Sequence, residues 1–199
     1  MSNVRPHMTE APEPGPDFDA VLRLGAEFKK ESDRGAVLGA AAMLEEALRE
    51  LLLAHLVPST SSTDLLFEGT NAPLNAFSSK IDMSFRLGLV SDRFCRDLHV
   101  VRRMRNDVAH RATGCTFEDA SLRDRALALT KSYGLFERSP EWRKKVGPQS
   151  ARQQFIESAS WMLFFLAAEQ ARVPVLKARH LEFGYEMSMD EPQSSEGGA

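Results

Sequence analysis

Polar and charged side chains gather in one predicted helix, from Ser91 to Arg111. This segment holds six arginines against three aspartates, in a chain whose formal net charge is −3. One line along the helix has residues at successive spacings of four, three and four: His99, Arg103, Asn106 and His110. Asp107 lies beside this line, four residues from both Arg103 and Arg111. Guanidinium, amide and imidazole groups stacked in this way could hold an anion. The alternative is a solvated helix face whose charges pair at i and i+4.

Arg105 interrupts the apolar side of the same helix. The apolar residues recur at steps of three, four and seven: Phe94, Leu98, Val101, Val108 and Ala112. Because a lone buried charge is costly, we expect Arg105 to meet a carboxylate or to reach a cleft or interface. Asp33 and Glu45, on the preceding long helix, are candidate partners. If Arg105 is structural, Arg105→Ala should lower stability on the order of 3 kcal/mol by leaving a buried carboxylate unpaired. The functional alternative stays open.

The segments that position these residues are predicted to be helices. Apolar residues recur at helical spacing, and no run of β-branched residues indicates a sheet. We therefore predict an all-α fold, a single-domain helical bundle of about six or seven helices. The first helix is expected at 17–30, and the second is capped by Ser32 or Asp33 and ended by Pro58. The third runs through Leu74, Phe77, Ile81 and Phe85 and is closed by Gly88. The fourth is capped by Ser91 or Asp92, and the last two are expected at 118–133 and 149–172.

Two of these helices carry clear burial patterns. In the second helix the stripe expected to face the core consists of Val37, Ala41, Leu44, Leu48 and Leu51. The sixth helix is apolar on all sides between Trp161 and Leu166, so it must be surrounded. We expect it to lie in the middle of its own bundle or, alternatively, to lend a second face to a partner subunit. A homodimer is the leading form of that second case.

Length and composition limit the class of protein. At 199 residues, 43% hydrophobic and 27% charged, the chain is typical of one globular domain. The start, 1–16, and the acidic Gly/Ser tail, 188–199, are expected to be disordered around a bundle domain of 17–187. The longest apolar run, Ala159 to Ala168, is about half the length that a bilayer span needs. We expect a cytoplasmic protein that does not enter the membrane.

Few residues indicate metal or cofactor chemistry. Cys95 and Cys115 lack metal-ligand spacing, so we expect two reduced thiols that act as small core residues. We predict no disulfide, no metal site and no cofactor. The chain also lacks a Gly-rich phosphate loop, a Gly-x-Ser-x-Gly elbow, a His-Glu-x-x-His motif and a Cys-x-x-Cys pair.

Four separated blocks of sequence are similar, in order and spacing, to the mannitol operon repressor family. They are Glu31–Gly35 before an alanine-rich helix, Asn71–Leu74 with Phe77–Ile81, Leu87–Ser91, and Arg102–His110. The resemblance covers roughly Glu31 to Asp119 and depends on the combination of blocks. It implies an all-helical regulator associated with repression of a sugar-alcohol uptake operon, in a family without an obvious DNA-reading motif.

The chain agrees with this implication, because it shows no helix-turn-helix signature and no basic recognition helix free of acids. Repression could run through a protein partner, through contacts to the nucleic-acid backbone, or by an indirect route. The residues that we expect to bind are Asp33, Arg34, Arg102, Arg103, Arg105, Asn106, Asp107 and His110.

A second, more distant resemblance is to the HEPN superfamily, whose ribonuclease members carry an Arg and a His separated by four to six residues on a bundle helix. Arg105 and His110 match this pattern, and Asn106 follows the arginine directly. The resemblance implies a metal-independent endoribonuclease of a toxin or defence system. His110 would exchange a proton with a 2′-hydroxyl or leaving oxygen, and Arg105 would stabilise charge on the phosphate. In an ideal helix the two side chains point about 140° apart, so this alternative needs long side chains or pairing across subunits.

Overall fold

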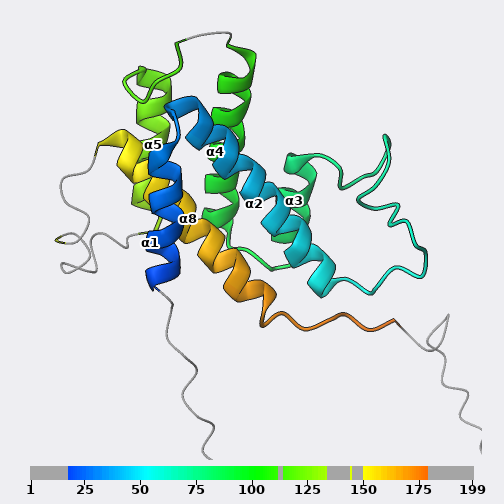
Figure 1. Ribbon diagram of the computed structural model, residues 1–199. Coiled ribbons are helices and arrows are strands. Elements are labelled where there is room, and N and C mark those ends of the chain that lie inside the picture. The colour runs from blue at the N-terminus through cyan, green and yellow to red at the C-terminus, as the bar shows by residue number, and fades with distance from the viewer. Residues whose placement is uncertain (1–17, 112–113, 134–143, 145–149, 179–199) are drawn as a thin grey trace, which may run out of the picture.

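A computed structural model describes residues 18–111, 114–133, 144 and 150–178 (Figure 1). Within these residues the chain forms six α-helices and no strand, in one compact helical arrangement, which confirms the predicted all-α bundle. The predicted arm, 1–16, and tail, 188–199, lie outside the described residues. None of the described helices is long and apolar enough to cross a membrane.

The helices begin and end close to the positions that the sequence predicts. They are α1 Phe18–Lys30, α2 Asp33–His55, α3 Phe77–Arg86, α4 Asp92–His110, α5 Ala120–Tyr133 and α8 Ala151–Gln170. Ser32 and Ser91 are the N-caps of α2 and α4, and each side-chain oxygen accepts a backbone N–H of the first turn. The predicted stripe of α2 is fully buried along its whole length.

Helix α8 lies in the middle of the bundle, where it contacts α1, α2 and α5 (Figure 1). Ten of its residues are buried, from Phe155 through Leu166, which explains why it is apolar on all sides. Most of this helix therefore lies inside its own bundle, whereas Phe164 and Phe165 are only partly buried. The packing weakens one of the two reasons for predicting a homodimer, and the homodimer stays a prediction. Sedimentation of the purified chain at micromolar concentration tests that prediction.

The third predicted helix needs one correction, at its start. Leu74 lies before α3, in a loop where its backbone N–H donates to Leu66 O at 2.8 Å. This bond commits the backbone of Leu74 to the loop, and the helix begins at Phe77. Phe85 is 39% exposed although it continues the apolar spacing of Ile81. Among the described helices α3 contacts only α2 and α4, so one side of its last turn faces solvent.

Candidate functional site

Six of the eight predicted binding residues lie on α4, which packs against α2, α3 and α5. Helices α3 and α4 are joined by a short turn at Gly88, whose φ of +74° suits a residue without a Cβ. Because α3 has 10 residues and α4 has 19, α3 covers only the first part of its neighbour. The first turn of α3 therefore lies beside the middle of α4, and the later turns of α4 extend past it.

A cleft of about 440 Å³ lies where the first turn of α3 meets the middle of α4. Its polar lining comes from four segments: Glu45 of α2, Thr70 and Asn75 of the loop before α3, Ser78 and Ser79 of the first turn of α3, and Arg102, Arg105 and Asn106 of α4. The cavity thus brings together three predicted binding residues, Arg102, Arg105 and Asn106, with Glu45, a predicted partner of Arg105. Its size is within the range of small-molecule sites.

Arg105 reaches both a carboxylate and the cleft, as expected for a charge placed in an apolar stripe. Its Nη2 donates to Glu45 Oε2 at 3.3 Å, and its Nη1 donates to Asn106 Oδ1 at 3.1 Å. Of the two candidate partners it meets Glu45. The Arg105 side chain is nevertheless 39% exposed. The reason is that α3 does not extend far enough along α4 to cover this turn. Met104, which is fully buried, contributes the apolar contact instead.

Glu45 is held by a second cation that the sequence analysis did not consider. Lys80 Nζ lies 2.9 Å from Glu45 Oε1 and donates to Asn75 O at 2.8 Å, and the Lys80 side chain is only 8% exposed. Removal of Arg105 therefore does not leave the carboxylate unpaired. The expected loss of about 3 kcal/mol for Arg105→Ala is too large for this arrangement, since the exposed pair contributes little.

Arg102 is a cation of the cleft that forms no ion pair with the described residues. Its Nε–H is buried and donates to no acceptor among them. A buried guanidinium N–H without an acceptor costs free energy. Because this N–H is closed to solvent, a molecule in the cleft meets other atoms of Arg102, which is one of the lining residues.

The wall opposite Arg102 is the beginning of α3, and it offers further donors. The N-cap of α3 is Ala76, whose side chain makes no capping hydrogen bond. The first N–H groups of a helix need acceptors from outside the helix, and the helix dipole favours negative charge at this end. Ala76 through Ser79 all line the cleft. Two arginines and an uncapped helix start thus make the cavity suited to an anion.

Asp33 and Arg34, two further predicted binding residues, do not line the cleft. Asp33 accepts from Arg152 Nε at 2.7 Å and from Phe117 N at 2.9 Å. Arg34 Nη1 donates to Arg111 O at 2.5 Å. Asp33 thereby ties the start of α2 to α8 and to the chain before α5, whereas Arg34 ties it to the end of α4. These contacts lie twelve residues from Glu45 along α2, about 18 Å in a straight helix.

The remaining predicted residues of α4 point in different directions. Asp107 pairs with Arg125 of α5 rather than with Arg103 or Arg111, because α5 packs against this side of α4. Arg103 and His110 are exposed, and neither lines the cleft. The line of residues at spacings of four, three and four therefore does not form one binding face. The cleft takes only Asn106 from it.

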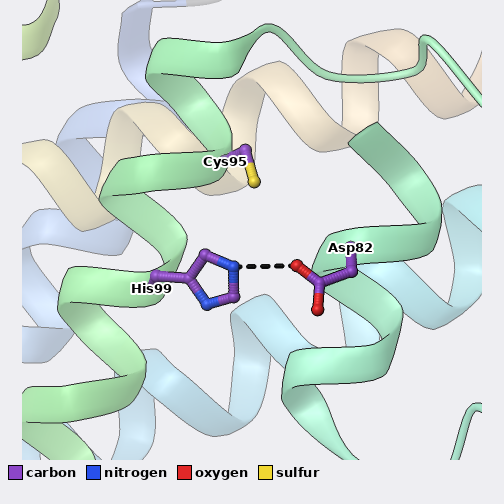
Figure 2. Close-up of side chains that lie close together, drawn as sticks. All are labelled: Asp82, Cys95 and His99. Carbon is purple, nitrogen blue, oxygen red and sulfur yellow. Dashed lines mark hydrogen bonds and ion pairs between the residues drawn. The ribbon is translucent and has the colours of Figure 1, made fainter. Parts of the chain in front are cut away.

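A second group of polar side chains lies one turn before the cleft, where α4 faces α3. His99 Nε2 is 3.0 Å from Asp82 Oδ1 of α3, and Cys95 lies one turn before His99 on α4 (Figure 2). Burial, together with the nearby Asp82 and Asp92 carboxylates, raises the pKa of the Cys95 thiol, and Arg96 opposes part of this effect. Cys95 and Cys115 are both buried, as predicted for small core residues, and both are free thiols in this structure.

Sequence reasoning missed the walls of the cleft and the partners of Cys95. Lys80, Ser78 and Ser79 belong to a block that resembles the repressor family, and this resemblance was the one signal that pointed to them. For the second group, the separation of four residues between Cys95 and His99 places both on one helix face. Nothing in the sequence indicates that Asp82 faces them from another helix.

No model of a known protein family matches this chain. No curated protein matches it, and no solved structure matches it either. The four blocks of sequence and the geometry of the cleft are therefore the features that indicate a function.

Proposed function

We propose that this protein is a non-enzymatic, cytoplasmic regulator of the mannitol operon repressor type, which represses a sugar-alcohol uptake operon and binds a phosphorylated small molecule in the cleft. The four sequence blocks support the regulator part of the proposal. The binding part depends on one observation: Arg102 and Arg105 line the same cleft as the uncapped start of α3. A phosphate group supplies acceptors to a guanidinium and to backbone N–H groups at the same time.

The rest of the lining supports a hydroxyl-rich ligand. Thr70, Asn75, Ser78 and Asn106 provide hydroxyl and amide groups that both donate and accept hydrogen bonds. Glu45 adds a carboxylate that accepts from a ligand hydroxyl. A phosphorylated sugar alcohol presents one dianionic end and several hydroxyls, so its two kinds of polar group match the two kinds of lining.

A small molecule fits the cleft better than a nucleic-acid backbone does. Binding to a duplex uses several phosphate contacts spread along a basic surface. In the described part of the chain, many arginines of α4, its C-cap and α5 are paired instead with acids: Arg96 with Asp92, Arg111 with Asp119, Arg123 with Asp124, and Arg125 with Asp107. Arg102 and Arg105, in contrast, both line the concave cavity.

The test compares Arg102→Ala with Arg103→Ala in cells that carry a sugar-alcohol uptake operon under its own promoter. Arg103 is exposed and adjacent in sequence, so its removal subtracts the same charge outside the cleft. We expect wild type and Arg103→Ala to repress the operon and to respond to the sugar alcohol, whereas Arg102→Ala loses the response. Equal behaviour of both variants would contradict the assignment of the cleft. A wild-type chain that leaves transcription unchanged would contradict the regulator itself.

The second candidate function is the HEPN-type endoribonuclease, and one observation favours it. Arg105 and Asn106 are hydrogen-bonded to each other and share the cleft, which places a cation where a phosphate would bind. His110 lies at the exposed end of α4, outside the cleft lining. The decisive test is incubation of the purified chain with RNA in a chelator. Degradation by the wild type that disappears in His110→Ala would replace the regulator proposal.

A further inference from the structure

Three side chains from two helices converge beside the α3–α4 turn. Asp82 lies on α3, and Cys95 and His99 lie on α4 (Figure 2). One carboxylate oxygen, the thiol sulfur and one ring nitrogen lie within 4.8 Å of one another. The Nε2 of His99 lies 3.0 Å from the Oδ1 of Asp82. In Figure 2 the imidazole ring projects from α4 toward the carboxylate, and the sulfur lies near both.

The local fold positions these groups independently of the cleft. Cys95 and His99 are separated by four residues, which places them on one face of α4 in successive turns. The turn at Gly88 folds α3 back along α4, and Leu89 N donates to Ser84 O at 2.9 Å to close it. This turn brings Asp82 opposite the two α4 residues. The cluster therefore depends on a short local hairpin rather than on distant parts of the chain.

The donor set has the chemistry of a transition-metal site. Thiolate sulfur, imidazole nitrogen and carboxylate oxygen are the three ligand types that Zn²⁺ accepts in proteins. Zn²⁺ bonds of about 2.0–2.3 Å place tetrahedral ligands roughly 3.3–3.8 Å apart. Atoms within 4.8 Å of one another reach that spacing by small side-chain rotations. Three protein ligands leave a fourth position for water or another ligand.

Exposure also differs among the three groups in a way that suits metal entry. Cys95 is buried, His99 is 23% exposed, and Asp82 is 65% exposed. A cation can approach from the Asp82 side while the sulfur remains shielded. As a purely structural contact, an ion pair with so exposed a carboxylate contributes little to stability. Stabilisation of the hairpin by the histidine–aspartate contact alone is thus a weak explanation for the arrangement.

We propose that Asp82, Cys95 and His99 form a three-ligand Zn²⁺ site that links α3 to α4. The site lies one turn of α4 before Arg102, and it is separate from the proposed phosphate site. Metal binding fixes α3 against α4 and thereby holds the helix whose first turn lines the cleft. This assignment departs from the expectation of no metal site, which considered only spacing along the sequence.

The test uses the full-length chain without an affinity tag, treated with chelator and then titrated with Co²⁺ as a spectroscopic substitute for Zn²⁺. The matched control is Cys115→Ser, which removes the other buried thiol, outside the cluster. We expect one Co²⁺ per chain and a thiolate-to-cobalt charge-transfer band in wild type and in Cys115→Ser. Cys95→Ser should lose the band. Competition by Zn²⁺ should remove the band from wild type.

His99→Gln and Asp82→Asn test the other two ligands without altering the thiol. Each should weaken Co²⁺ binding by at least the roughly tenfold that loss of even a supporting partner causes. Zn²⁺ should raise the Tm of wild type and Cys115→Ser but not of Cys95→Ser, with circular dichroism showing the same helix content in all variants. A band that survives in Cys95→Ser, or affinity unchanged in both His99→Gln and Asp82→Asn, would overturn the site.

Discussion

Lys80 Nζ lies 2.9 Å from Glu45 Oε1, whereas Arg105 reaches the other oxygen of the same carboxylate at 3.3 Å. Lys80 is almost fully buried, and its ammonium also donates to Asn75 O. Arg105 is considerably more exposed. The lysine is therefore the structural partner of Glu45, and the arginine can turn toward a molecule in the cleft without leaving the carboxylate unpaired.

This division of roles predicts stability losses of different size for two cationic residues. Lys80→Met keeps most of the side-chain volume but removes the buried charge, and it should lower the free energy of unfolding by about 3 kcal/mol. Arg105→Ala should cost no more than about 1 kcal/mol, since its pair is exposed and Lys80 remains. Urea denaturation followed by circular dichroism measures both. An equal or larger loss for Arg105→Ala would restore the purely structural interpretation of that arginine.

The uncapped start of α3 allows stability and binding to be moved in opposite directions. Ala76 has the extended backbone of an N-cap residue, with φ −78° and ψ 144°. Ala76→Asp should stabilise the chain by about 1 kcal/mol, because its carboxylate accepts the free N–H groups of the first turn. The same carboxylate should repel a bound phosphate and weaken the ligand. Ala76→Ser supplies a neutral cap and should weaken binding less. Undiminished affinity in Ala76→Asp would show that the anion does not lie at this helix start.

Arg152 and Asp33 should matter for folding and not for the ligand. Arg152 Nε donates to Asp33, and its Nη2 donates to the backbone oxygens of Phe28, Lys29 and Glu31. Arg152→Ala removes a charged donor from a half-buried network and should destabilise the chain by about 2 kcal/mol. Calorimetry below the unfolding temperature should find ligand affinity unchanged. A specific loss of affinity would return Asp33 to the binding site.

The sequence predicted the helices better than the contacts between them. Ser32 and Ser91 predict the starts of their helices from local sequence, because an N-cap side chain bonds to a backbone N–H within the next three residues. The start of α3 was misplaced, because Leu74 continues the apolar spacing and the loop bond to Leu66 is a tertiary feature. The choice of Glu45 over Asp33 as the partner of Arg105 depends on whether the middle or the start of α2 lies beside the cleft. Helix packing decides this, and spacing within one helix does not.

The environment of Cys95 predicts a pH effect in the metal-free protein. Burial and the neighbouring carboxylates raise the pKa of this thiol, so the folded state holds its proton more tightly than the unfolded state does. In the Cys115→Ser variant with chelator, the thiolate absorbance should therefore titrate at higher pH in the folded chain than in urea. Between these two midpoints stability should fall as pH rises, and Cys95→Ser should lack this decline. A folded midpoint below the unfolded one would contradict the described surroundings of Cys95.

Isothermal titration calorimetry of a phosphorylated sugar alcohol tests the central claim most directly, with Arg102→Ala and Arg103→Ala compared under the same conditions. We predict one ligand per chain for wild type and for Arg103→Ala, with similar affinity, and a loss of about tenfold or more for Arg102→Ala. The unphosphorylated sugar alcohol should bind more weakly than the phosphorylated one. Equal weakening in the two arginine variants, or equal affinity for the two forms of the sugar alcohol, would contradict a phosphate site in the cleft.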